Sequence, residues 1–342
     1  MKLIVQIPCF NEAATLPAVL RDIPRRIRGI EPVEVLVVDD GSTDGTVEVA
    51  RECGADHIVR HTSNQGLARA FRTGLDTSLM LGADIIVNTD GDNQYAGSDI
   101  PHLIQPILDG SADIVVGDRD TRNVSHFSPV KKLLQALGSS VVRALSGTRV
   151  PDTVSGFRAI SREAALHLNI ISPFSYTIEM LIQAGSKHLA ITTVAVRTNP
   201  VARSSRLFKS TPQFISRSVA TMVRVYTMYK PLSTFFTIGS MVGFIGLVPI
   251  LRFLYLYAIG QGAGHVQSLV LGGALLVIGF MILLIGLVAD LINFNRQLIE
   301  ITLEKVRRLE AAYGSGRGRK PNERHRSGSD TSAANWTEKE DE

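Results

Sequence analysis

The sequence predicts an α/β domain with a mostly parallel sheet, followed by two transmembrane helices. Three observations lead to this prediction. Short aliphatic runs alternate with helix-like stretches in the first half of the chain, two later segments are almost free of charge, and the last thirty residues are polar. A chain of 342 residues is long enough for one domain with substantial extensions.

Five runs in the first half are apolar throughout, as expected of strands buried on both faces. They lie at residues 3–7, 33–39, 57–60, 83–89 and 112–117. Helix-like stretches separate them, for example at 12–27, 43–53 and 66–81. This alternation predicts a mostly parallel, Rossmann-like sheet with helices on both sides. Ligands of such sheets bind at the carboxyl ends of the strands, where loops and helix N-termini meet.

Charge and cysteine content narrow the class of protein. The formal net charge is +4, but Lys and Arg collect beside the apolar segments and in the tail. We therefore expect a membrane surface as partner and no nucleic acid. Cys9 and Cys53 form neither a disulfide framework nor a metal-ligand spacing, which fits a reducing compartment. The first residues lead directly into a strand without a signal-peptide pattern, so we expect this domain to stay in the cytosol.

Two uncharged segments follow the α/β domain. Residues 231–251 carry no charge, the apolar stretch continues beyond Arg252 to 259, and residues 266–289 are again uncharged. Each segment can span a bilayer core of about 30 Å as a helix that rises about 1.5 Å per residue. Basic residues lie on the outer flanks and none lies in the short connection; they are Lys209, Arg217, Arg224, Lys230, Arg296, Lys305, Arg307 and Arg308. By the positive-inside rule, both ends of the chain are cytosolic.

The expected boundaries follow from these patterns. They are a cytosolic domain at 1–210, an interfacial juxtamembrane helix at 211–230, transmembrane helices at 231–259 and 266–290, a cytosolic helix at 291–312 and a disordered tail at 313–342. Apolar residues of the segment 212–229 share one helical face, which favours a helix lying along the cytosolic leaflet. An ordinary surface helix packed on the domain is the alternative.

The sequence Thr-Asp-Gly-Asp-Asn-Gln at 89–94 follows the fourth strand. Asp90 and Asp92, two residues apart on a tight turn, can hold a hard divalent cation, and Gln94 can supply a neutral oxygen. Asp-Gly turns also occur for backbone reasons alone. The position at a strand end favours a site for Mg²⁺ or Mn²⁺.

Two more polar motifs end the first and second strands. Asp39 and Asp40, within VVDDGSTDGT at 37–46, can accept from a base N–H or a ribose hydroxyl. Alternatively they only cap and turn the chain, with Ser42 or Thr43 capping the next helix. In PCFNE at 8–12, Asn11 is either a helix cap or part of a turn, fixed by Pro8, that presents backbone groups to a nucleotide.

The motif NQGLARAFRTG at 64–74 opens a helix after Gly66. Arg69 and Arg72 lie in its first turns, so this helix N-terminus could meet a phosphate group.

Together these four motifs resemble those of glycosyltransferase family 2, the inverting enzymes with the GT-A fold that include cellulose synthase, dolichyl-phosphate mannose synthase and undecaprenyl-phosphate glycosyltransferases. The resemblance covers about residues 1–230. It implies a GT-A catalytic domain in which the first two motifs hold the nucleoside and the Asp-x-Asp motif holds the metal-bound diphosphate. The residues that would carry these roles are Pro8, Asn11, Glu12, Asp39, Asp40, Asp90, Asp92 and Gln94.

The second half of the domain resembles the polyprenyl-phosphate branch through VVGDR at 115–119 and DTVSGFRAISREAA at 152–165. In that branch the Ser-Gly-Phe-Arg segment lies by the acceptor. Processive polysaccharide synthases instead carry a Gln-x-x-Arg-Trp motif, and the single tryptophan here, Trp336, lies in the tail.

A basic strip, RTNPVARSSRLFKS at 197–210, leads to the membrane segments and differs from the Gly-x-Ser-Lys version of dolichyl-phosphate mannose synthases. We expect Arg203 and Arg206 to bind the acceptor phosphate or the leaving diphosphate. Lys209 does the same or contacts lipid headgroups. With Asp92 and Arg119, the two arginines complete the expected catalytic set.

The sequence thus predicts metal-dependent, inverting transfer of a hexose from a UDP- or GDP-sugar to a polyprenyl phosphate at the cytosolic membrane face. One alternative is a diacylglycerol or other glycolipid hydroxyl acceptor, which needs a carboxylate base such as Glu179. Another is a membrane scaffold that only binds nucleotide. A homo-oligomer is compatible with the sequence.

Overall fold

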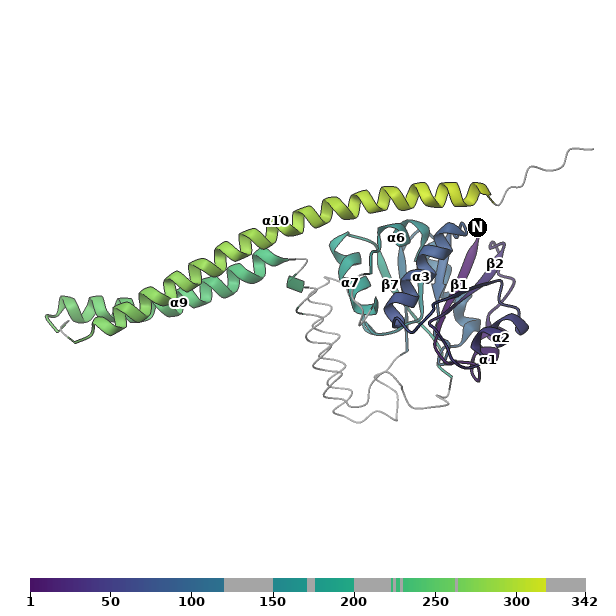
Figure 1. Cartoon of the computed structure of the whole chain (residues 1–342), viewed down its shortest axis with the longest axis horizontal. Coiled ribbons are helices and arrows are strands. Elements are labelled where there is room, and N and C mark those ends of the chain that lie inside the picture. The colour runs from purple at the N-terminus through teal and green to yellow at the C-terminus, as the bar shows by residue number, and fades with distance from the viewer. Residues whose placement is uncertain are drawn as a thin grey trace, which may run out of the picture.

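In the computed structural model, a seven-stranded sheet lies at the centre of the N-terminal domain (Figure 1). The strand order is β3-β2-β1-β4-β6-β5-β7. The strands are β1 (Leu3–Cys9), β2 (Val33–Asp39), β3 (His57–Arg60), β4 (Ile85–Asn88), β5 (Ile114–Asp118), β6 (Arg158–Ser161) and β7 (Ile191–Ala195). The structure describes residues 1–119, 150–170, 176–199, 223, 226–227, 230–261 and 264–317, with side chains up to 310 in the last helix.

Helices cover both faces of this sheet and form two cores. The first core packs under α3 (Leu67–Met80), α6 (Arg162–His167) and α7 (Tyr176–Ser186). The second packs under α1 (Leu16–Asp22), α2 (Thr46–Glu52), η1 (Gly97–Asp99) and α4 (Ile100–Leu108). Within β1, Ile4 belongs to the first core, whereas Leu3 and Val5 belong to the second. Burial on both faces explains why β1, β2, β4 and β5 consist mostly of apolar residues.

The predicted mostly parallel sheet is confirmed, and all five predicted runs contain a strand. The sequence did not predict β6 or β7; β6 lies between β4 and β5 and runs antiparallel to both. Pro8 was expected in a turn, but it lies inside β1 opposite Val38 of β2. Proline is tolerated there because the pairing of β1 with β4 ends at Gln6, so no hydrogen bond of the ladder is lost on that side.

Two long apolar helices follow, α9 (Pro231–Ala258) and α10 (Val266–Arg317). Both are long and apolar enough to cross a membrane, as predicted. They pack as an antiparallel hairpin with glycines at the contact. A Cβ at Gly239 would lie 2.8 Å from the Gly279 carbonyl oxygen, and one at Gly246 would lie 3.0 Å from that of Gly272. Small residues therefore allow the two backbones to approach closely.

Helix α10 does not end at the membrane boundary expected at residue 290. It continues for 52 residues in all, about 78 Å at 1.5 Å per residue, and runs along the N-terminal domain (Figure 1). The boundary expected at 312 also falls inside it, because residues 313–317 are helical. Neither glycine nor proline occurs between Gly286 and Gly314, so nothing in this part of the sequence interrupts the helix.

The membrane-distal part of α10 is attached to the domain through ion pairs. The Arg307 side chain is 9% exposed; its Nη1 donates to the Leu168 carbonyl at 2.6 Å and its Nη2 lies 3.2 Å from Asp76 Oδ1 of α3. Glu304 Oε2 lies 2.7 Å from His167 Nδ1 of α6. Exposed ion pairs contribute little individually, so the buried Arg307 is the principal anchor.

Candidate functional site

The loops after β1, β2 and β4 meet at one edge of the sheet. β1 lies between the other two strands, with Cys9 opposite Asp39 and Gln6 opposite Asn88. Because neighbouring strands are about 4.8 Å apart, the loops after β2 and β4 lie about 10 Å apart across the end of β1. Burial raises the pKa of the Cys9 thiol well above its usual value, and nearby carboxylates, including Glu12, Asp39 and Asp90, raise it further. The structure therefore brings acidic groups from three motifs together.

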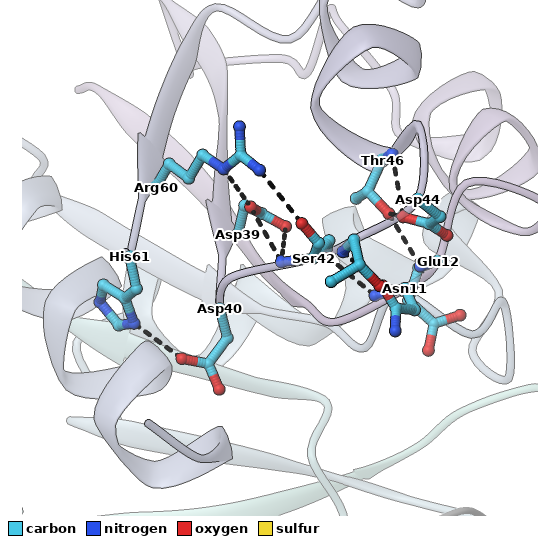
Figure 2. A network of polar contacts seen from close by, with 10 residues as sticks. Asn11, Glu12, Asp39, Asp40, Ser42, Asp44, Thr46, Arg60 and His61 are labelled. Atoms are coloured by element: carbon cyan, nitrogen blue, oxygen red, sulfur yellow. Dashed lines mark hydrogen bonds and ion pairs between the residues drawn. The ribbon is translucent and has the colours of Figure 1, made fainter. Parts of the chain in front are cut away.

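Hydrogen bonds lock the first motif to the second (Figure 2). The Asn11 backbone N–H donates to Ser42 Oγ at 2.9 Å, and the Asn11 side-chain oxygen accepts from the Thr43 N–H at 2.9 Å. The Glu12 N–H donates to Thr46 Oγ1 at 2.9 Å. Asn11 is not a helix cap, because α1 begins only at Leu16. Its side chain instead holds the two loops together.

The neighbouring carboxylates of Asp39 and Asp40 point to different partners (Figure 2). Asp39 is fully buried, accepts from the Ser42 N–H at 3.3 Å and lies 3.2 Å from Arg60 Nε. The Arg60 guanidinium also donates to the Ser42 carbonyl at 3.1 Å. Asp39 thus offers an oriented acceptor at the strand end, next to an arginine that is half exposed.

The carboxylate of Asp40 is occupied by contacts within the protein. Its carboxylate lies 2.7 Å from His61 Nδ1 and accepts from the N–H groups of Gln65 at 2.9 Å and Gly66 at 2.8 Å. Asp40 is 3% exposed and already takes two donors just before the N-terminus of α3, where a phosphate group was expected. The reason is favourable electrostatics, since a helix N-terminus attracts any anion, including one from the chain itself.

The turn after Asp40 depends on glycine. Gly41 has a φ of +74°, and a Cβ there would lie 2.5 Å from the Ser63 carbonyl carbon. Ser42 and Thr43 were expected to cap α2, but its N-cap is Gly45. Asp44, which sequence reasoning left unassigned, accepts from the Thr46 N–H at 3.1 Å instead.

The Asp-x-Asp motif follows β4. Asp92 Oδ1 accepts from the Gln94 N–H at 3.0 Å. Asp90 is partly buried; desolvation and then the Asp92 charge raise the pKa of the Asp90 carboxyl to about 7. Thr15 Oγ1 lies 2.7 Å from both Glu12 Oε2 and the Gly91 carbonyl oxygen, which ties the first motif to this loop. A carboxylate whose pKa is raised by a neighbouring carboxylate fits a divalent cation, which would relieve their repulsion.

Arg119 lies beside this loop, and its positive charge opposes the rise in the pKa of Asp90. Its guanidinium forms a bidentate ion pair with Asp152, at 2.7 Å from Nε to Oδ2 and 3.1 Å from Nη2 to Oδ1. Its Cζ lies 5.9 Å from the centroid of the Tyr95 ring. Asp152 therefore fixes the arginine, which contributes charge to the site from a set position.

The loop before β6 carries the Ser-Gly-Phe-Arg segment that the resemblance placed by the acceptor, but sequence reasoning gave its single residues no role. A Cβ at Gly156 would lie 2.7 Å from Asp90 Oδ2, so glycine lets this loop pack on the carboxylate. The Gly156 carbonyl accepts from Asn88 Nδ2 at 2.8 Å. Arg158 is fully buried and donates to the carbonyls of Ser155, Thr177 and Thr153 at 2.8–2.9 Å. The available signal was an arginine within an apolar run, which a folded protein must pair.

Three expected residues, Arg203, Arg206 and Lys209, lie outside the described residues. Gln94 follows the Asp-x-Asp motif, and its backbone carbonyl accepts from the Asn199 N–H at 2.9 Å. Glu179 was the candidate base for a hydroxyl acceptor, but it is fully buried in α7. Its carboxylate accepts from Gln183 Nε2 of the same helix at 3.3 Å.

Comparison with solved structures confirms the fold. Glucosyl-3-phosphoglycerate synthase from Mycobacterium tuberculosis, solved in complex with Mn²⁺, UDP and glucosyl-3-phosphoglycerate, superposes with a TM-score of 0.51 over 66% of this chain and 78% of that one. The sequences are 22% identical, so this likeness concerns the GT-A fold alone.

Comparison with sequences of known proteins shows the family. The model of glycosyl transferase family 2 matches residues 4–168. A UDP-N-acetylglucosamine–dolichyl-phosphate N-acetylglucosaminyltransferase of Methanococcus voltae is 31% identical over 217 residues, 56% of this chain and 83% of that protein. An undecaprenyl-phosphate mannosyltransferase of Micrococcus luteus is 27% identical over 233 residues, 66% of this chain and 93% of that protein. The chain therefore belongs to glycosyltransferase family 2.

Proposed function

We propose that this glycosyltransferase moves one hexose from a UDP- or GDP-sugar to a polyprenyl phosphate, with inversion at the anomeric carbon. The observation that carries the proposal is the meeting of Asp39, Asp90 and Asp92 at one sheet edge, in a chain with two apolar helices after the domain. Relatives named as transferases to dolichyl and undecaprenyl phosphate support this acceptor class.

The donor would bind across the acidic edge. Asp39, held by the Ser42 N–H and Arg60, would accept a hydrogen bond from the nucleoside. Asp90 and Asp92, with Gln94 as a neutral ligand, would hold Mg²⁺ or Mn²⁺. The bound cation would neutralise the departing diphosphate. Arg119, fixed by Asp152, adds positive charge beside the same position.

The acceptor needs little activation, because the second pKa of a phosphate monoester is about 6 and the group is already anionic at pH 7. The work of the protein is then to position the acceptor and exclude water. We assign the acceptor phosphate to Arg203 and Arg206. The Asn199 N–H donates to the Gln94 carbonyl, and four residues extend at most about 14 Å, so the chain length would allow Arg203 to reach the loop of Asp92 and Gln94.

The same proposal includes the topology. The domain at 1–210 and both chain ends would lie in the cytosol, with an interfacial helix at 211–230 and membrane spans within 231–259 and 266–290. Basic residues on the outer flanks of the hairpin support this orientation. A homo-oligomer is part of the proposal.

A donor and acceptor screen tests the function. Purified protein in nanodiscs would receive UDP-glucose, UDP-N-acetylglucosamine or GDP-mannose, each with polyprenyl phosphate or diacylglycerol. Released nucleoside diphosphate and radiolabelled lipid would be measured with EDTA and after addition of Mg²⁺ or Mn²⁺. We expect cation-dependent transfer to polyprenyl phosphate. Sugar transfer to diacylglycerol alone would refute polyprenyl phosphate as the acceptor. If no donor released nucleoside diphosphate, a scaffold that only binds nucleotide would be favoured.

A further inference from the structure

Helix α10 has a strict seven-residue pattern on the face turned toward the rest of the chain. Its buried positions are Gly272, Gly279, Gly286, Asn293, Glu300 and Arg307. The three glycines pack against α9, and Glu300 and Arg307 form ion pairs with the N-terminal domain. A repeat of seven places all six residues on one seam of the helix.

A second seam of the same period lies on another face and is exposed. Ile292, Ile299 and Val306 recur every seven residues and are 64%, 68% and 43% exposed. Asn295, Thr302 and Leu309, three residues after each of them, are exposed as well. With Leu298 and Leu303, residues of these seams line a shallow apolar groove along the helix. In the heptad notation of coiled coils, Ile292, Ile299 and Val306 occupy a positions, and the residues three positions after each of them occupy d positions.

The bilayer cannot cover this part of the helix. A span of about 30 Å uses about 20 residues, so a span that starts near Val266 ends before residue 290. Val306 lies about 24 Å beyond that point along the axis. α10 continues without a sharp bend and does not fold back toward the hairpin (Figure 1). An apolar seam held at this distance from the membrane fits a protein partner.

We propose that the partner is α10 of a second copy, in a parallel two-stranded coiled coil. β-branched residues at a positions favour two strands when leucine occupies d positions, as Leu309 does here. Lys305 occupies a g position and Glu310 the e position five residues later, so Lys305 of each copy would face Glu310 of the other. Copies inserted with the same orientation bring their helices together in parallel. The buried seam lies on a different face, which leaves both N-terminal domains outside the pair.

The exposed seam spans fewer than three heptads beyond the membrane, and two of its d positions are polar. Such a pair would be weak in solution, because polar residues at core positions lower the stability of a coiled coil. Anchoring both helices in one membrane raises their effective concentration and makes a weak contact sufficient.

Cysteine cross-linking of the full chain in membranes tests this contact. The background is Cys53→Ser, since Cys9 is buried. Ile299→Cys lies on the exposed seam, and Ile301→Cys, at a position 52% exposed, is the matched control on another face. Mild oxidation should link Ile299→Cys into dimers several-fold more than Ile301→Cys. Equal linking at both positions, or none at Ile299→Cys, would overturn the proposal.

Charge reversal tests the pairing without touching the apolar seam. Lys305→Glu, combined with Ile299→Cys, should lower the dimer fraction several-fold at low salt, because like charges then face each other. Adding Glu310→Lys should restore it. An unchanged dimer fraction in Lys305→Glu would refute the parallel register. Cross-linking needs no substrate, so its outcome is independent of the proposed sugar transfer.

Discussion

Replacing Arg119 by methionine should destabilise the N-terminal domain strongly. Arg119 forms a bidentate ion pair with Asp152, whose side chain is 1% exposed. Removal of one partner of a buried pair leaves an uncompensated charge and costs about 3–5 kcal/mol. In a domain of 150–250 residues, each kcal/mol lowers the Tm by about 2–4 °C, which gives a loss of about 6–20 °C. Circular dichroism melts of the purified protein in detergent would measure it.

A double variant separates stability from activity. Arg119→Met/Asp152→Leu removes both charges and should recover most of the lost Tm, because a neutral pair needs no compensation. If Arg119 also supports the leaving diphosphate, this stable variant should still transfer sugar at least about 10-fold more slowly, a loss typical of one electrostatic contact. An Arg119→Met protein within about 1 kcal/mol of the parent, or a double variant no more stable than the single one, would refute the reasoning.

Three further perturbations test the site and the hairpin. Asp92→Asn should reduce cation-dependent transfer by at least about 100-fold while the Tm and membrane insertion stay unchanged; an active variant would exclude this metal ligand. Burial raises the pKa of Asp90 to about 7, so between pH 4 and 7 the folded, metal-free protein binds more protons than the unfolded chain. Its stability in EDTA should therefore fall as pH rises through this range, and Asp90→Asn should remove that part of the slope; an identical slope would contradict the assignment. Gly279→Leu should disrupt the hairpin, read out as lower Tm and faster proteolysis, because a Cβ there would lie 2.8 Å from the Gly239 carbonyl oxygen. Gly273→Leu, at a position open to space, is the control and should behave like the parent.

The sheet could be predicted where burial leaves a pattern in the sequence. β1, β2, β4 and β5 are largely buried on both faces and are therefore recognisable as mostly apolar runs. β6 could not be recognised in this way. It has only four residues and begins with Arg158, whose buried charge is satisfied by three backbone carbonyls that only the folded chain brings together.

The acidic edge was predictable because motifs at the carboxyl ends of adjacent parallel strands must meet. The separate tasks of Asp39 and Asp40 were not. The partner of Asp40, His61, is 21 residues away, and its other donors belong to the loop before α3. The role of each carboxylate depends on the groups that surround it after folding. Asp39 ends β2 and Asp40 follows it, and successive side chains along an extended chain point in opposite directions.

The end of α10 shows the same limit for the membrane part. Hydropathy indicates where a bilayer span ends, but a helix ends only where a breaker or a cap stops it. Residues 291–310 replace the uniformly apolar surface by a charged seam and an apolar seam, both with a period of seven. The charged residues of this part pair with residues of α3 and α6. These partners lie more than 100 positions earlier in the chain, so the sequence of α10 alone does not identify them.

These attachments constrain the orientation of the acidic edge. Asp76, which receives Arg307, lies in the second half of α3, whereas α3 begins next to Asp40 at the carboxyl edge of the sheet. α10 therefore docks toward the amino ends of the strands and leaves the acidic edge uncovered. Asn199, the last described residue before the gap that precedes α9, lies beside the loop of Asp92 and Gln94. The docked helix and the acidic edge therefore lie at opposite ends of the strands.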